Sequence, residues 1–161
     1  MAVLADTHIP GRARALPPAA WDVLGGCELV LHAGDVVGET LLGEIARARP
    51  VHAVRGNNDR HMKRLPERLE LNIEGVRLAM VHDSGARDGR RPRLRRWFPD
   101  ARVVVFGHSH IPFAEDEDGL LLVNPGSPTD RRRMPTHTMA VLTIDGGHPT
   151  AELIDLGRER A

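Results

Sequence analysis

The chain has 161 residues, and we expect residues 1–161 to form a single domain with a sizeable core. Lysine plus arginine and aspartate plus glutamate both number 22, so the formal net charge is zero, which argues against stable binding to nucleic acid or to a membrane surface. No apolar run approaches the roughly 18 residues of a transmembrane helix, and the N-terminus lacks a signal-peptide pattern, so we expect a cytoplasmic protein.

The first third of the chain alternates short apolar runs with helical patterns. Pro17 and Pro18 suit the first turn of a helix, and Pro50 suits a position just beyond a helix end. Short strands that alternate with amphipathic helices predict a parallel sheet covered by helices. The expected strands are 1–5, 28–32 and 51–54, and the expected helices are 17–24 and 40–49.

The remainder of the chain is richer in antiparallel patterns. Gly75 separates two runs that read as a hairpin, and Asp118-Gly119 is a strong tight-turn signal. We expect a loop over 145–149 between the last two strands. Two sheets, one fed by helices and one built of antiparallel pairs, predict a layered α/β sandwich. The expected strands are 70–74, 76–81, 101–106, 113–117, 120–123, 139–144 and 150–156, and the expected helix is 92–98.

Candidate metal ligands follow the ends of these strands. The first strand is followed by Asp6 and His8, two positions apart, so that both side chains point the same way on an extended segment. Asp35 follows the second strand, and a carboxylate at this point has two oxygens with which to serve two ions. In open α/β sheets, ligands bind at the carboxyl ends of the strands. The complete candidate set is Asp6, His8, Asp35, Asn57, His82, His108 and His110.

The clustering of these residue types predicts a dinuclear metal site. Mixed nitrogen and oxygen ligands suit Mn, Fe, Zn, Co or Ni. Two ions about 3.5–4 Å apart clamp the oxygens of an in-line phosphoryl displacement.

Other polar residues are interpreted as structural. We expect His32 to be a satisfied supporting histidine, and we leave open whether Asp59 contacts a metal ligand or caps a loop. Cys27 is expected to be a small buried side chain. The arginine-rich segments 87–96 and 131–133 are interpreted as solvated surface, with capture of an anionic substrate or polyanion as the alternative. The histidines expected to face solvent are His52, His61, His137 and His148.

The ordered motifs resemble those of the calcineurin-like metallophosphoesterase superfamily, and most closely its short prokaryotic phosphodiesterase branch, which includes relatives of the retromer sorting subunit. The resemblance spans nearly the whole chain and implies a four-layer α-β-β-α sandwich with two mixed sheets flanked by helices. The motifs that carry it are Asp6-x-His8, Gly34-Asp35, Gly56-Asn57-x-Asp59, His82 and Gly107-His108-x-His110.

The resemblance also implies roles for the candidate residues. One metal would be held by Asp6, His8 and His110, the other by Asn57, His82 and His108, and Asp35 would bridge them. The expected cofactors are two divalent ions, Mn²⁺ before Ni²⁺, Co²⁺, Fe²⁺ or Zn²⁺. A hydroxide between the ions would attack a small phosphoester, most readily a phosphodiester, with Asp35, Asn57 and His108 as the expected catalytic residues.

Two departures from the family bear on the substrate. Asn58 stands where the phosphoprotein phosphatases place a histidine acid, and Asp83-Ser84 follows His82 in place of Gly-His. Without such an acid, we expect a preference for acidic leaving groups such as those of aryl phosphodiesters. The alternatives are a phosphomonoesterase or nucleotidase on small metabolites and a non-catalytic binding scaffold like the retromer relatives. A homodimer is expected, because members of this branch often form dimers.

Overall fold

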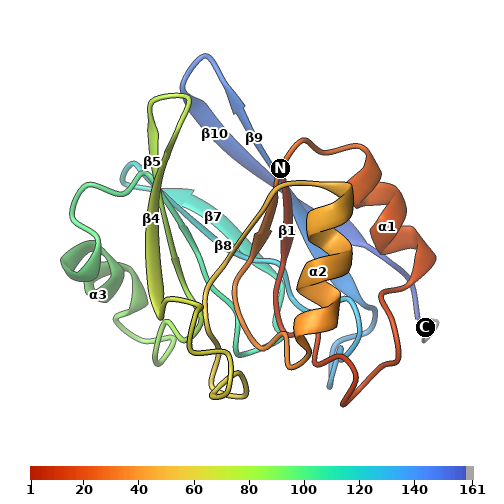
Figure 1. Cartoon of the computed structure of the whole chain (residues 1–161). Coiled ribbons are helices and arrows are strands. Elements are labelled where there is room, and N and C mark those ends of the chain that lie inside the picture. The colour runs from red at the N-terminus through yellow and green to blue at the C-terminus, as the bar shows by residue number, and fades with distance from the viewer. Residues whose placement is uncertain (159–161) are drawn as a thin grey trace.

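The fold was determined as a computed structural model that describes residues 1–158 (Figure 1). Within this range the chain forms ten strands and three helices. The elements in chain order are β1 (Ala2–Leu4), α1 (Pro18–Gly25), β2 (Val30–His32), α2 (Glu39–Ala48), β3 (Val51–Ala53), β4 (Arg68–Ile73), β5 (Val76–Val81), α3 (Arg90–Trp97), β6 (Val103–Val105), β7 (Phe113–Glu117), β8 (Leu120–Asn124), β9 (Thr138–Asp145) and β10 (His148–Asp155).

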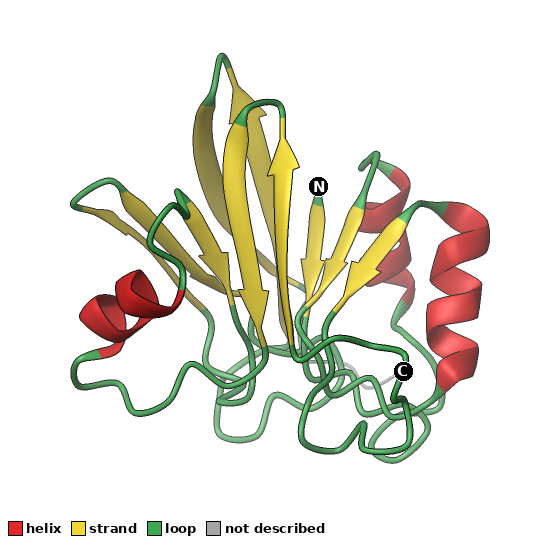
Figure 2. Cartoon of the chain, turned by 60° about the vertical axis from the view of Figure 1, so that its left-hand side comes forward, coloured by secondary structure: helices red, strands yellow, loops and turns green. Residues whose placement is uncertain are grey.

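The strands form two mixed five-stranded sheets. The first sheet has the order β10-β9-β1-β2-β3, in which β1, β2 and β3 are parallel and the β9–β10 hairpin joins antiparallel. The second has the order β4-β5-β6-β8-β7, with a parallel centre and an antiparallel strand at each edge. Figure 2 shows the two sheets between α3 on one side and α1 and α2 on the other. The predicted four-layer α-β-β-α architecture is therefore confirmed.

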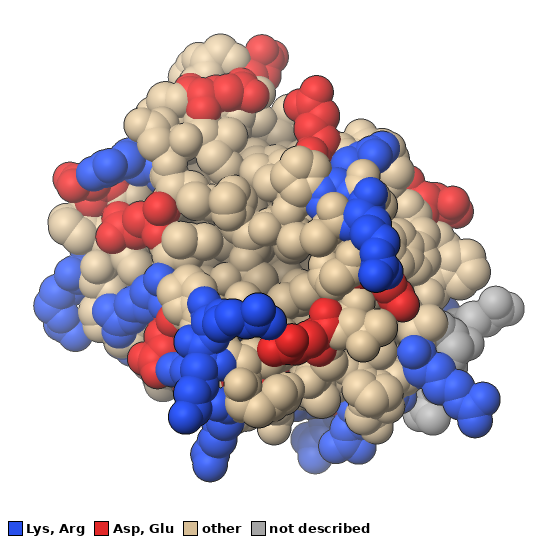
Figure 3. All heavy atoms as spheres, in the orientation of Figure 1, with Lys and Arg blue, Asp and Glu red and all other residues tan. Residues whose placement is uncertain are grey.

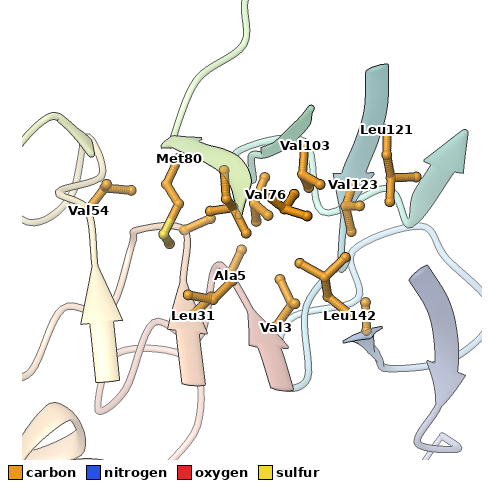
Figure 4. Packing of buried hydrophobic residues seen from close by; sticks show 14 residues of the cluster. Val3, Ala5, Leu31, Val54, Val76, Met80, Val103, Leu121, Val123 and Leu142 are labelled. Carbon is orange, nitrogen blue, oxygen red and sulfur yellow. The ribbon is translucent and has the colours of Figure 1, made fainter. Parts of the chain in front are cut away.

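Strand alternation explains why the layers stack in this order. Val3 of β1 points between the sheets, whereas Leu4 points outward and packs against helix residues such as Leu24 and Ile45. Successive side chains of a strand lie on opposite faces, so each strand of the first sheet contributes to both layers. Figure 4 shows the core between the sheets, which is built from aliphatic side chains of β1, β2, β5, β6, β8 and β9. A third apolar cluster joins α3 to the outer face of the second sheet through Leu94.

The sequence-predicted elements are all present, with bounds that shift mostly by one or two residues. The expected loop 145–149 is shorter than predicted, because the turn comprises only Gly146 and Gly147. Pro149 lies within β10 and pairs with Ile144. A proline is tolerated there because β10 is an edge strand, where one side of the backbone needs no ladder hydrogen bond.

Two predictions about single side chains have different outcomes. Cys27 is buried, as expected. His137 was predicted to face solvent, and this is wrong, because only 2% of it is exposed. Its backbone N–H donates to the oxygen of Gly157, and its oxygen accepts from the N–H of Leu156, so the segment after β10 covers it.

The loops that follow β1, β2, β3, β5 and β6 meet at one end of the sandwich, the lower end in Figures 1 and 2. Backbone hydrogen bonds join them: the Asp6 N–H donates to Gly34 oxygen, and the Gly107 N–H donates to His82 oxygen. None of the helices in residues 1–158 has the length and apolar character needed to cross a membrane.

Candidate metal centre

The seven predicted ligands lie together at this loop end, although they come from five different strand ends. One group comprises Asp6, His8 and His110. The Asp6 Oδ1 atom lies 3.3 Å from His110 Nε2 and 3.9 Å from His8 Nε2, and the two histidine Nε2 atoms are 3.3 Å apart. Their ligating atoms are close enough to one another to share a single ion.

A second group surrounds His82. Its Nε2 atom lies 3.4 Å from Asp35 Oδ2 and 3.1 Å from Asn57 Oδ1, and Asn57 Oδ1 is also 2.9 Å from His108 Nδ1. The His82 nitrogen is 3.9 Å from Asp6 Oδ1, and Asp6, Asp35 and His82 form a second set with the spacing of an ion site. Asp6 therefore faces both groups.

The tautomers of two histidines suit metal binding. His82 Nδ1 lies 2.8 Å from the backbone oxygen of Ala33, and His110 Nδ1 lies 2.5 Å from that of Asp130. A carbonyl oxygen only accepts, so each Nδ1 carries a hydrogen and each Nε2 offers its lone pair to the centre. Donation of the second ring N–H to a carbonyl is the usual support of a metal-ligating histidine.

One buried oxygen tests whether the site fits a cation. Asp6 Oδ1 is buried and accepts no hydrogen bond within the described chain, although Asp6 Oδ2 accepts the N–H of His108 at 2.8 Å. An unsatisfied buried carboxylate oxygen is costly unless it is paired or coordinates a metal. The surrounding donor atoms are imidazole nitrogens and carboxylate oxygens, so the residues present fit a divalent transition ion.

The backbone at the centre adopts a conformation that is rare for residues other than glycine. Asp6, His8, Asp35, His108 and His110 all have positive φ, between 47° and 68°. Each such residue costs about 1–3 kcal/mol unless its surroundings compensate, and such residues cluster at functional sites. Five of the seven predicted ligands are therefore held in left-handed backbone that the rest of the fold must enforce.

Glycines next to the ligands allow the loops to approach one another. A Cβ on Gly56 would lie 2.2 Å from Asp35 Oδ1, and a Cβ on Gly107 would lie 2.8 Å from Asp6 Oδ2. A Cβ on Gly34 would meet both the Gly56 backbone and the His82 ring at 2.8 Å. Gly34, Gly56 and Gly107 each directly precede a predicted ligand in the sequence. Because they lack a Cβ, each leaves space that a predicted ligand from another loop fills.

Burial and charge shift the pKa of the two carboxyl groups in opposite directions. Burial raises the pKa of Asp6 to about 7, although the charge of His82 opposes it. Burial also acts to raise the pKa of Asp35, but the contact with His82 and the hydrogen bonds from Asn58 outweigh it and hold that pKa well below its usual range. Asp35 is therefore the more acidic carboxyl group of the pair in the metal-free protein.

The histidines divide in the same way. Burial lowers the pKa of His110 to about 4 and also lowers that of His8, so both rings are neutral at pH 7, the form that binds metals. Burial opposes protonation of His82 as well, but the carboxylates of Asp35 and Asp6 raise its pKa above the ordinary value. The pKa of His82 is therefore shifted in the opposite direction to those of His8 and His110.

Buried polar residues fasten the ligand loops to one another. His32 Nδ1 accepts the N–H of Gly34, which leaves Nε2–H to donate to the Thr7 hydroxyl at 3.1 Å. The supporting role predicted for His32 agrees with these contacts. Asp59 accepts hydrogen bonds from the backbone N–H groups of Val36, Val37 and Gly56, and so ties the loop of Asp35 to that of Asn57.

The loop that follows β8 supports the ligand loops, a role that the sequence alone does not indicate. Ser127 Oγ donates to the oxygen of Asp6 at 2.7 Å, and Thr129 Oγ1 donates to that of Thr7 at 2.6 Å. Asn124 Nδ2 donates to the oxygen of Gly107 at 2.9 Å. The sequence signal was only the Asn124-Pro125-Gly126-Ser127 run after a strand, which fits any tight loop.

Sequence reasoning also missed the contact between Asn58 and Asp35. The backbone N–H of Asn58 donates to Asp35 Oδ1 at 2.8 Å, and its side-chain amide donates to Asp35 Oδ2 at 2.6 Å. Both oxygens of Asp35 are thus oriented by a single neighbour. Nothing in the pattern Gly56-Asn57-Asn58 distinguishes this residue from an ordinary loop asparagine.

The centre opens into a groove of about 310 Å³. It is lined by three predicted ligands, Asn57, His82 and His108, and by the residues Arg55, Gly56, Glu67, Arg68, Val81 and Asp83. Arg55 is paired with Glu67. The groove gives a bound molecule access to the second metal group from solvent.

Comparisons with known proteins identify the family of the chain. Residues 1–147 match the model of the calcineurin-like phosphoesterase superfamily domain. A probable metallophosphoesterase of Methanothermobacter thermautotrophicus is 39% identical over 158 residues, which cover 96% of this chain and 91% of the relative.

Solved structures share the fold over nearly the whole chain. A Thermotoga maritima protein solved by NMR is 30% identical, with a TM-score of 0.74 and coverage of 96% of this chain and 98% of that one. Vps29 from Entamoeba histolytica in complex with zinc is 26% identical, with a TM-score of 0.76 and coverage of 96% and 97%. The chain therefore belongs to the calcineurin-like phosphoesterase superfamily.

Proposed function

We propose that this protein is a phosphodiesterase that uses two divalent metal ions, with Asp35 as their shared ligand. One observation carries the proposal. Asp35 Oδ2 lies 3.7 Å from His8 Nε2, in the first group, and 3.4 Å from His82 Nε2, in the second. A carboxylate between two sets of imidazole nitrogens is placed to serve both.

The remaining ligands divide between the two ions. Asp6, His8 and His110 would hold one ion, and Asn57, His82 and His108 would hold the other. When bound, two such ions supply an activated water and neutralise charge on the phosphoryl oxygens. The zinc in the Entamoeba histolytica relative supports a metal-dependent centre. Mn²⁺ is the ion we would test first, because the carboxylate and amide oxygens of the centre suit it.

The surroundings of the centre favour diesters with acidic leaving groups. Asn58, at the position where some relatives would place a histidine acid, is engaged by both oxygens of Asp35. Asp83 and Ser84 follow His82, so no histidine follows it directly. The groove beside His108 leaves room for an ester group. A leaving group that departs as a stable anion needs no protein acid.

Activity assays with defined metals test the proposal. The purified protein would be stripped with EDTA, loaded with Mn²⁺, Co²⁺, Ni²⁺ or Zn²⁺, and assayed on bis(p-nitrophenyl) phosphate and p-nitrophenyl phosphate. We expect diester hydrolysis that requires metal and a loss of at least about 1000-fold in Asp35→Asn, equivalent to about 4 kcal/mol. Asp22→Asn, on the exposed face of α1, is the matched control. Full activity of Asp35→Asn with both metals bound would refute the shared-ligand role.

A leaving-group series tests the diester preference separately. Aryl methyl phosphodiesters with phenols of increasing pKa should show a steep fall in kcat/KM, because no protein acid assists departure. A rate that does not depend on the phenol pKa would contradict this part of the proposal. Faster hydrolysis of monoesters than of matched diesters would replace the diesterase with a phosphomonoesterase.

A further inference from the structure

The two sides of the metal centre differ in charge. On the His82 side, the groove contains two arginines and two acidic residues, and Arg55 is already paired with Glu67 at 2.5 Å. On the His110 side lies a second cavity, of about 270 Å³, which we call the 129–132 cavity. It is lined by Gly11, Arg12, Thr129, Asp130, Arg131, Arg132 and His137, with three arginines and a single acidic residue.

The 129–132 cavity shares its walls with the ligand loops. Asp130 oxygen accepts the His110 Nδ1 hydrogen, and the Arg12 N–H donates to the oxygen of His8 at 2.7 Å. Arg12 itself is a loose partner of Asp130, with 3.7 Å between the charged atoms and 70% of its side chain exposed. A group bound in this cavity would therefore lie next to the first metal group.

Arg132 stands between the cavity and the centre. Its Nη1 donates to the oxygen of His108 at 3.4 Å, and its backbone has a φ of +49°. Within residues 1–158, neither Arg131 nor Arg132 forms an ion pair with a carboxylate.

Arg132 is exposed, lacks an acidic partner among the described residues, and lies in strained backbone next to the candidate metal centre. This combination favours a binding role for Arg132. Arginine is the side chain best suited to bind phosphate, because its planar fork presents several donors in fixed geometry. Figure 3 shows Lys and Arg side chains on the lower part of this face, with Asp and Glu side chains among them and also near the top.

We propose that the 129–132 cavity, with Arg132 at its mouth, binds a second phosphate group of the substrate. The inference rests on the proposed function and narrows its substrate class to phosphodiesters that carry a further phosphate near the scissile bond. The substrate would lie across the centre in one orientation. Its phosphate-bearing part would occupy the 129–132 cavity, and its leaving group would occupy the groove beside His82 and His108.

A matched pair of substrates measures how much the second phosphate contributes to kcat/KM. The probes are the 5′-(p-nitrophenyl phosphate) of thymidine with a free 3′-hydroxyl and the same compound with a 3′-phosphate. They have the same scissile bond and the same leaving group. We expect the Mn²⁺-loaded protein to hydrolyse the 3′-phosphorylated probe with a kcat/KM at least about tenfold higher, mostly through a lower KM, which is a difference of about 1.4 kcal/mol.

Arg132→Gln should remove most of this discrimination. It should lower kcat/KM about tenfold for the 3′-phosphorylated probe and by no more than about threefold for the other, losses of about 1.4 and 0.7 kcal/mol. Arg132→Lys keeps the charge and should recover part of the loss. Arg133→Gln is the matched control, because Arg133 is exposed, adjacent in sequence and outside the cavity lining. An equal loss on both probes would overturn the proposal, since Arg132 would then act on the scissile phosphate.

A binding measurement separates this inference from the proposed function. Dissociation constants of thymidine 3′,5′-bisphosphate and thymidine 5′-monophosphate would be measured by calorimetry, with Mn²⁺ and with EDTA. Tighter binding of the bisphosphate, lost in Arg132→Gln, supports the cavity even if neither probe is hydrolysed, in which case only the phosphodiesterase assignment fails. Equal affinities, or no binding of either compound in both conditions, overturn the second-phosphate site.

Discussion

The two ends of the sandwich place different residue types at positive φ. The hairpin end is the one that carries the β4–β5 and β9–β10 turns, and the loop end is the one that carries the predicted ligands. At the hairpin end, Gly75, Gly146 and Gly147 take positive φ, and a Cβ on any of them would meet nothing within 4 Å. At the loop end, positive φ falls on aspartate and histidine as well as on Gly34, while Gly56 serves close packing. Glycine takes most of these positions at the hairpin end, with Glu74 as an exception, whereas five of them at the loop end hold predicted ligands.

This difference indicates that the backbone at the loop end is shaped to position the predicted ligands, even where this costs stability. Strained residues persist only where their surroundings over-determine them. Here the surroundings are the buried hydrogen bonds of Asp59, Ser127 and Thr129, which fix the ligand loops from behind. Substitutions that relieve backbone strain, or that fill the space beside a glycine, should therefore change the free energy of unfolding by different amounts at the two ends.

The largest effect of a single substitution on stability is expected from a methyl group at the loop end. In Gly56→Ala the new Cβ would clash with the backbone N and side chain of Asp35. We expect the free energy of unfolding to fall by about 3 kcal/mol or more. Gly75→Ala, in open space at the hairpin end, should cost only the left-handed penalty of about 1–2 kcal/mol. Urea denaturation of both variants makes the comparison, and equal losses would contradict it.

A second effect should appear on acidification. Burial lowers the pKa of His32 to about 4 from an ordinary value of 6.5, so the unfolded chain binds a proton here that the folded chain excludes. The contribution of His32 to stability is therefore complete above about pH 6.5 and is lost as the pH falls toward 4. Over about 2.5 units, at about 1.4 kcal/mol per unit, the loss is about 3 kcal/mol.

The comparison of wild type with His32→Gln isolates this contribution. The stability advantage of wild type should be greatest at pH 7.5 and should shrink by about 3 kcal/mol at pH 4. His52→Gln, on the exposed part of the neighbouring strand β3, controls for the loss of an imidazole. An advantage of wild type that stays constant with pH would show that His32 does not exclude a proton in the folded state.

Metal binding should offset the strain of the loop end. Mn²⁺ at one hundred times its dissociation constant should raise the free energy of unfolding by about 2.7 kcal/mol for each site. Thermal denaturation with Mn²⁺ and with EDTA measures the difference, and Asp35→Asn should lose at least half of it. An unchanged Tm with Mn²⁺, Co²⁺, Ni²⁺ and Zn²⁺ would argue against a metal centre.

The smallest effect is expected from relief of strain at the hairpin end. Glu74 is exposed and has a φ of +50° next to Gly75. Glu74→Gly removes the left-handed penalty but adds backbone entropy to the unfolded chain, so we expect a gain of up to about 1 kcal/mol. A clear loss of stability on urea denaturation would show that the side chain of Glu74 contributes more than its backbone conformation costs.

Much of the fold and of the candidate site is predictable from the sequence, because both depend on local patterns. Strand alternation and turn residues locate the elements, and the strand ends carry the ligand types. The contacts that orient the site are not predictable in this way. The bonds from Asn58 to Asp35 and from Ser127 to Asp6 join residues whose types fit any loop. His137 was misplaced because its cover comes from the segment after β10, which is distant from its predicted loop.

The most direct test of the account is a crystal structure of the Mn²⁺-loaded protein with anomalous data collected at the manganese edge. The account predicts two anomalous peaks, one bounded by Asp6, His8 and His110 and the other by Asn57, His82 and His108, with an oxygen of Asp35 bound to each ion. A single peak, or two peaks of which only one contacts Asp35, would contradict the shared-ligand centre.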